Sequence, residues 1–106
     1  MGCHRPVSGV LKSGRVLTTY REASFSFQRG FWAKNTFACL TDNKSVLKDF
    51  GNSVILPLDH DRSPCSDSGY TGWVQLSDES IFVVNYITAD AQRAYVKWYQ
   101  IHEDDF

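Results

Sequence analysis

The sequence of 106 residues lacks the features that mark several large classes of protein. No apolar run approaches the roughly 20 residues that a helix needs to cross a bilayer. The formal net charge is −1, with acidic and basic residues interspersed, and the basic stripe typical of a nucleic-acid-binding surface is missing. We therefore expect neither a membrane nor a nucleic acid as a partner.

Cysteine is also scarce, because Cys3, Cys39 and Cys65 are odd in number and widely spaced. Such a set favours reduced thiols in the cytoplasm over a disulfide framework. Residues 1–6 contain no apolar segment of the kind that a secretory signal needs, so we expect a cytoplasmic location. The hydrophobic fraction of 42% indicates a folded chain, and its length predicts a single domain over residues 1–106.

A faint internal repeat with a period of about 65 residues is the most informative pattern that is present. Residues 11–19 (LKSGRVLTT) correspond to residues 76–84 (LSDESIFVV) in this repeat. Each copy reads as the end of an apolar strand, a polar turn of about four residues and a β-branched strand. An aromatic-rich strand follows each copy, at 35–40 and at 94–99. Such a repeated strand-turn-strand-loop-strand unit is typical of the blades of a propeller.

The pattern of apolar residues predicts about seven strands and no long helix, so the fold class is all-β. The expected strands are 7–11, 16–21, 36–40, 53–58, 72–76, 80–87 and 93–101. Pro57 indicates an edge position for its strand, and we expect the acidic tail at 102–106 to be frayed.

We expect these strands to form two propeller-like antiparallel blades of three to four strands each. Unit one covers about 5–58 and unit two about 72–101. Unit two lacks an outer strand, so its edge is either exposed or completed by residues near 3–5. Because open edges pair with other chains, we expect a homo-oligomer, for example three copies that close a six-bladed ring. A flattened sandwich of two small sheets is the alternative.

Two sets of short motifs resemble a known superfamily. The first set is Arg5-Pro6, Val10-Leu11, Gly14-Arg15-Val16-Leu17 and Tyr20-Arg21-Glu22; the second is 67–70 (DSGY), 74–76 (VQL) and 81–86 (IFVVNY). The first set resembles the opening segment of sialidase-like (Asp-box or BNR) β-propellers, and the second is similar to a later blade. The chain departs from the family's Asp-box at 40–47, which keeps Asp42 and has Leu47 in place of a Trp, and its Arg-Pro motif lacks the middle residue.

The resemblance implies a site in which arginines hold the carboxylate of a sugar, with a tyrosine nucleophile beside a carboxylate. The expected ligand-binding residues are Arg5, Arg21, Glu22, Asp67, Tyr70, Trp73 and Tyr86. Other residues open to the same roles are Arg29, Arg62, Arg93, Tyr20 and Trp32. Residues 28–30, where the family's acid is expected, contain no carboxylate, so we expect no catalysis by a single copy.

The polar loop at 59–71 is where we expect function to concentrate. Its Asp59, His60, Asp61, Cys65 and Asp67 also suggest a metal site or a Cys–His nucleophile. The spacing lacks the glycine and the terminal Glu of the known calcium loop, and His60 with Cys65 supplies only two of the three protein ligands that zinc needs. We therefore expect no metal and no cofactor, and interpret the aspartates as caps of turns.

Taken together, the residues favour a carbohydrate-binding or small-ligand-binding and assembly module that is not catalytic alone. One alternative is a sialidase-type hydrolase whose site is assembled across subunits. The other is a structural oligomer without a ligand.

Overall fold

Seven strands form two antiparallel sheets in the computed structural model, which describes residues 3–26, 31–45 and 52–106. The first sheet has the order β1 (Cys3–Val10), β2 (Val16–Ser26), β3 (Phe31–Thr41) and β4 (Ser53–His60). The second has the order β5 (Gly72–Gln75), β6 (Ile81–Ile87) and β7 (Tyr95–Ile101), and a 3-10 helix follows at Glu103–Asp105. Among these elements, no helix is long and apolar enough to cross a membrane.

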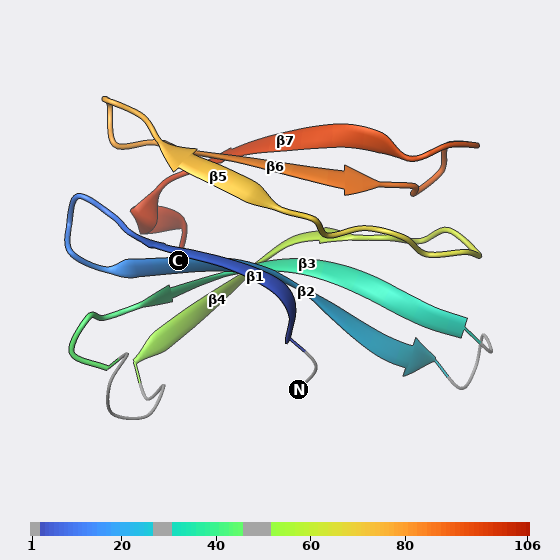
Figure 1. Ribbon diagram of the computed structural model, residues 1–106, viewed down its shortest axis with the longest axis horizontal. Helices are drawn as coiled ribbons and strands as arrows, with labels where there is room; N and C mark the ends of the chain where they lie inside the picture. The colour runs from blue at the N-terminus through green and yellow to red at the C-terminus, as the bar shows by residue number, and fades with distance from the viewer. Residues whose placement is uncertain (1–2, 27–30, 46–51) are drawn as a thin grey trace.

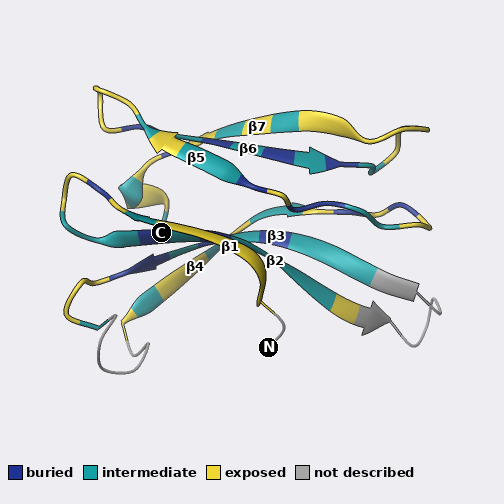
Figure 2. Cartoon of the chain, viewed as in Figure 1, coloured by how far each residue is buried: buried dark blue, intermediate teal, exposed yellow. Residues whose placement is uncertain are grey.

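The two sheets lie as two layers and share the core between them (Figure 1). Side chains alternate along β6, so that Ile81, Val83, Asn85 and Ile87 are buried and the residues between them are partly exposed. The buried apolar cluster that joins the layers is Leu11, Leu17, Ala38, Leu40, Ile81, Val83 and Ile101. Figure 2 shows this buried layer between the sheets, whereas β1 and much of β7 are exposed.

This architecture confirms the all-β class and two antiparallel sheets of four and three strands. It also confirms that the strand with Pro57 is an edge, because β4 is the last strand of the first sheet. The idea that residues near 3–5 complete the second sheet is wrong, because they pair with β2 as part of β1. Both β5 and β7 are edges of the second sheet.

The repeat is visible in the two hairpin turns that it predicted. The amide of Leu11 donates to the carbonyl of Arg15 at 2.8 Å, and the carbonyl of Leu11 accepts from the amide of Gly14 at 2.9 Å. Leu76 makes the same two hydrogen bonds: its amide donates to the carbonyl of Ser80 at 2.8 Å, and its carbonyl accepts from the amide of Glu79 at 3.1 Å. The two turns also touch, since the Nζ of Lys12 donates to the Leu76 carbonyl at 3.0 Å.

The acidic tail is not frayed, which corrects the expectation from its composition. Phe106 is partly buried and packs against the shared core, and Glu103 forms an ion pair with Arg15 and accepts a hydrogen bond from Ser13 at 2.9 Å. Burial of the Phe106 side chain offsets the entropy cost of ordering the tail. The acidic composition of residues 103–105 gave no sign of this contact.

Candidate ligand-binding site

The connection between β4 and β5, residues 61–71, lies between the two layers at one end of the sandwich (Figure 1). Its anchor is Asp61, which is 1% exposed and accepts hydrogen bonds from the amides of Ser63 and Asp67, both at 2.8 Å, and of Ala89 at 3.1 Å. Burial alone would raise the Asp61 pKa, but these bonds and others together lower it below its usual value. The interpretation of Asp61 as a turn cap is confirmed, and it fixes the loop in place.

The anchored loop brings together a group that we call the Arg21 cluster. Its members are Arg5, Arg21, Lys34, Asp67, Tyr70 and Tyr86, from β1, β2, β3, the connection and β6. Asp67 is its centre: one carboxylate oxygen accepts from Lys34 Nζ at 2.9 Å and from the Tyr86 hydroxyl at 2.8 Å. The same oxygen lies 3.8 Å from Nη1 of Arg21.

Arg21 is held firmly against the loop. Its side chain is 13% exposed, and its Nη1 donates to the Ser68 carbonyl at 3.0 Å. Gly69 lies directly on the stem of Arg21, because a Cβ atom there would be 2.5 Å from Arg21 Cβ. Gly69 also has a φ of +96°, which L side chains rarely adopt. A glycine is therefore required at this contact on two independent grounds.

Arg5 reaches the cluster through an irregularity in β1. The pairing shifts between His4 and Val7, so two residues of β1 lie opposite Tyr20 alone, as in a β-bulge. Arg5 in this bulge has a φ of 53°, and its guanidinium carbon lies 5.2 Å from the ring centroid of Tyr70. A left-handed non-glycine residue costs about 1–2 kcal/mol. The contact between the Arg5 guanidinium and the exposed aromatic ring offsets part of that cost.

Two arginines therefore converge on the Tyr70 ring. The guanidinium carbon of Arg21 lies 5.7 Å from its centroid, and the Tyr86 ring lies 5.5 Å away on centroids. Tyr70 is 53% exposed, so this assembly is open to solvent. Cation–π contacts of this kind contribute about 0.5–1 kcal/mol each at exposed sites.

The charges in the Arg21 cluster do not balance. Burial raises the pKa of Asp67, but the hydrogen bonds from Lys34 and Tyr86 and the charges of Lys34 and Arg21 outweigh it and lower that pKa. Burial and the adjacent Asp67 carboxylate raise the pKa of Tyr86 to about 12, so its phenol remains a hydrogen-bond donor at neutral pH. Three cations thus face one carboxylate, and the cluster has an excess positive charge suited to an anion.

Two of the expected ligand-binding residues lie elsewhere. Glu22 is on the outer face of the first sheet, in a cavity of about 530 Å³ that it shares with Cys3, Tyr20 and Cys39. Burial, followed by neighbouring ionisable groups, raises the pKa of the Cys3 thiol and of the Tyr20 phenol there. Trp73 instead packs against the shared core, and its indole N–H donates to the Val7 carbonyl at 3.2 Å between the edge strands β5 and β1.

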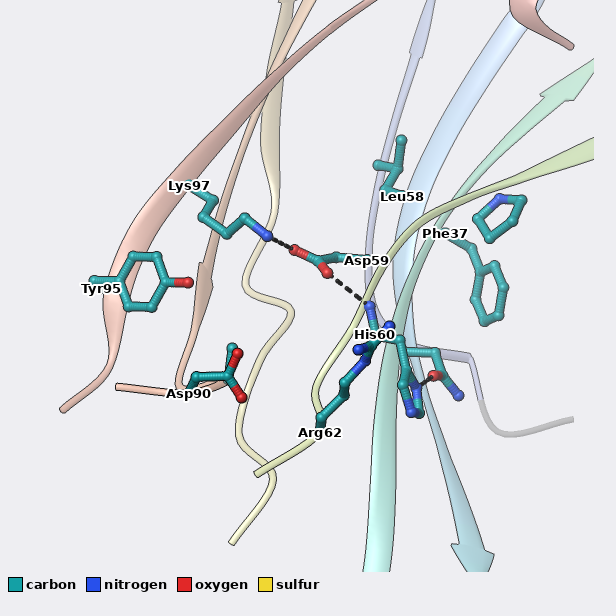
Figure 3. Close-up of a pocket in the computed structure, with 11 residues that line it drawn as sticks. Phe37, Leu58, Asp59, His60, Arg62, Asp90, Tyr95 and Lys97 are labelled. Atoms are coloured by element: carbon teal, nitrogen blue, oxygen red, sulfur yellow. Dashed lines mark hydrogen bonds and ion pairs between the residues drawn. The ribbon is translucent and has the colours of Figure 1, made fainter. Parts of the chain in front are cut away.

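A second cavity, of about 640 Å³, opens between β4 and β7 and was not foreseen. Figure 3 shows Lys97 reaching from β7 to Asp59 of β4, with Arg62 and Asp90 around the same opening. Asp59 also accepts from the Tyr99 hydroxyl, and although burial raises the Asp59 pKa, these bonds outweigh it and lower that pKa. The sequence contained one signal for this cavity: Lys97 and Tyr99 are two residues apart along β7, so both side chains point toward the first sheet.

The remaining candidates do not join the Arg21 cluster. Arg62 lines the second cavity, Arg93 is exposed, and Arg29 lies outside the described residues. The His60 imidazole is hydrogen-bonded to Asn35, and Cys65 is exposed. Over residues 3–26, 31–45 and 52–106, no group of three or more His, Cys, Asp or Glu side chains is placed to hold a metal ion.

Comparisons of the chain with models of protein families, with curated proteins and with solved structures found no match.

Proposed function

We propose that this protein binds a small carbohydrate that carries a carboxylate, and that the Arg21 cluster is the binding site. The observation that carries the proposal is the convergence of Arg5 and Arg21 on the ring of Tyr70, at 5.2 and 5.7 Å. Guanidinium groups bind carboxylates through paired hydrogen bonds, and an exposed tyrosine ring provides the apolar surface on which a sugar packs.

The arrangement of the cluster supports a binding role for it. Arg21 and Lys34 already neutralise the Asp67 carboxylate, at 3.8 and 2.9 Å. The guanidinium of Arg5 is therefore the cation of the cluster that can bind a ligand. The loop is fixed by Asp61 before any ligand arrives, which lowers the ordering cost of binding.

We further propose that the two sheets are blade-like units related to sialidase-like propellers, in a cytoplasmic protein that assembles into a homo-oligomer. The support is the matching pair of hairpin turns 65 residues apart and the meander order of each sheet. The open edges β1, β4, β5 and β7 are available for pairing with further copies.

The decisive experiment is a titration with N-acetylneuraminic acid as the probe and its methyl ester as the neutral control, followed by NMR chemical shifts. Arg5→Gly is the sharpest variant, because glycine accepts the left-handed backbone at this position while the guanidinium is lost. We expect it to weaken binding of the acid about tenfold or more, since a hydrogen bond to a charged group contributes about 1.5–3 kcal/mol.

Arg93→Ala is the matched control, because it removes one positive charge from an exposed position outside the cluster. It should leave the affinity unchanged. Equal binding of the acid and its ester, or equal effects of the two arginine variants, would contradict the proposal. Absence of any binding would favour the structural oligomer.

The hydrogen bond from Tyr86 to Asp67 favours a second candidate, a sialidase-type hydrolase, because that chemistry uses a tyrosine beside a carboxylate. With a pKa of about 12, Tyr86 would need Asp67 to accept its proton during attack. A fluorogenic sialoside tests this directly: turnover that disappears in Tyr86→Phe would establish the hydrolase, whereas binding without turnover supports the binding module.

A further inference from the structure

The outer face of the second sheet is apolar over most of its three strands, and Tyr86 and Gln100 are its polar members. Val74, Phe82, Val84, Val96 and Trp98 alternate with the buried residues and therefore point away from the first sheet. The register places Val74 beside Phe82, and Val84 beside Trp98. Val96 and Trp98 are 71% and 61% exposed, and the Phe82 and Trp98 rings stack at 5.1 Å.

No outward-facing residue of β5, β6 or β7 is charged, although the Tyr86 hydroxyl at one end of the face donates to the Asp67 carboxylate. The only charged residue in β5, β6 and β7 is Lys97, and it points inward to Asp59. The outer face of the first sheet differs, because Glu22 lies there among Thr and Ser side chains. Covering the second sheet would therefore remove apolar surface from water without desolvating an ion.

We propose that the face formed by Val74, Phe82, Val84, Val96 and Trp98 binds the same face of a second copy of this chain. An uncharged patch is complementary to itself, and one patch that meets its own copy forms a two-fold contact that closes at a dimer. Two sheets pack face to face at about 10 Å through such side chains. The face adjoins the Arg21 cluster, because the register places Tyr86 beside Val96, but it is independent of pairing through the sheet edges.

The size of the face sets the strength of the dimer. Val74, Val96 and Trp98 are each more than half exposed, and a face of this kind offers roughly 300–600 Å² on each copy, the range of a monomer's largest apolar patch. A contact of about 1,000 Å² in total lies just below the roughly 1,200–2,000 Å² of stable complexes. The dimer therefore dissociates on dilution.

The neighbourhood of the face argues for a second copy over an anionic bilayer. Asp78 and Glu79, in the turn between β5 and β6 at one end of this face, are exposed, and acidic groups are repelled by the negative surface of such a membrane. In a two-fold dimer, Asp78 and Glu79 of the two copies repel each other only weakly, because salt screens exposed charges over about 8–10 Å.

The test is sedimentation velocity on the full chain over about 1–200 µM, the range in which a weak dimer populates both states. We expect the mass to rise from 12.1 kDa toward twice that value. Val96→Lys should keep the protein monomeric throughout. Val10→Lys is the matched control, because Val10 is also a 71% exposed strand valine but lies on the first sheet, and it should dimerise as the parent does.

Each other outcome overturns the proposal. A monomer at every concentration, a trimer as in ring closure, or equal effects of the two lysine variants would each do so. Binding of the parent, but not of Val96→Lys, to phosphatidylcholine vesicles would assign the face to lipid instead. Circular dichroism confirms the fold of each variant, and Val74→Lys repeats the test on β5 if Val96→Lys does not fold.

Discussion

Gly14 and Glu79, 65 residues apart, occupy the same position in two hairpin turns with the same hydrogen bonds. Their amides donate to the carbonyls of Leu11 and Leu76, at 2.9 and 3.1 Å. Both have left-handed backbones, with φ values of 86° and 69°. One turn thus has the residue that this conformation favours, and its copy does not.

This relationship predicts opposite effects of exchanging the residue types. Gly14→Ala should lower the free energy of unfolding by about 1 kcal/mol, because it places a Cβ atom in the left-handed region. Glu79→Gly should raise it by about 0.5 kcal/mol, since the relief of strain exceeds the extra entropy of glycine in the unfolded chain. Urea unfolding curves measure both. A loss of stability in Glu79→Gly would show that its side chain contributes more than the turn geometry implies.

The buried carboxylate of Asp61 predicts an acid limit to stability. Its pKa is lowered in the folded protein, because hydrogen bonds to the loop amides outweigh the effect of burial. Between the folded pKa and the unfolded value of about 3.9, the unfolded state binds more protons. The contribution of Asp61 is therefore complete above about pH 5 and is lost as the pH falls through the folded pKa.

Asp61→Asn should cost about 2–4 kcal/mol at neutral pH, because the amide cannot accept all of these hydrogen bonds and brings two buried donors. It should also make the stability less dependent on pH between about 5 and 2. Thermal unfolding across that range measures both effects, and Asp104→Asn, at an exposed position in the 3-10 helix, is the control. An unchanged acid slope would show that other carboxyl groups determine it.

The contact between Gly9 and Trp73 predicts a coupled pair of substitutions. A Cβ atom at Gly9 would lie 2.8 Å from Cζ2 of Trp73, so Gly9→Ala should cost about 1–3 kcal/mol. In a Trp73→Phe background the ring no longer fills that space, and the same change should cost measurably less. A double-mutant cycle by urea unfolding measures the coupling.

Gly72→Ala is the control for that cycle. Its Cβ atom would lie 3.6 Å from Cγ2 of Val84, an ordinary van der Waals contact, so we expect a change within about 0.5 kcal/mol. Additive effects of the Gly9 and Trp73 substitutions would mean that β1 moves away from the indole at little cost.

The strands and turns of this protein were predictable because they depend on neighbours in the chain. The alternation of Ile81, Val83, Asn85 and Ile87 is visible as a period of two, and Gly14 marks its own turn. The tail at Glu103–Asp105 was misread for the opposite reason: its order depends on a contact with Arg15, which is distant in the sequence.

The candidate site was predictable only in part. Arg5, Arg21, Asp67, Tyr70 and Tyr86 were expected from a resemblance and do meet, but Glu22 points to the other side of its sheet. Both Arg21 and Glu22 were expected to bind one ligand, but alternation along β2 separates neighbouring residues onto opposite faces of the sheet. Lys34 was missed, although its spacing from Thr36 and Ala38 places it on the inner face.

The sequence by itself determined the all-β class, the hairpins and the apolar alternation of the second sheet, because local conformation and strand alternation depend on residue type and spacing. Tertiary structure alone decided that the Ala89 amide donates to Asp61, that Lys34 and Tyr86 share Asp67, and that Lys97 crosses to Asp59. Each of these contacts joins residues from different strands and loops. They exist only because burial of the common core brings the two sheets into one stack.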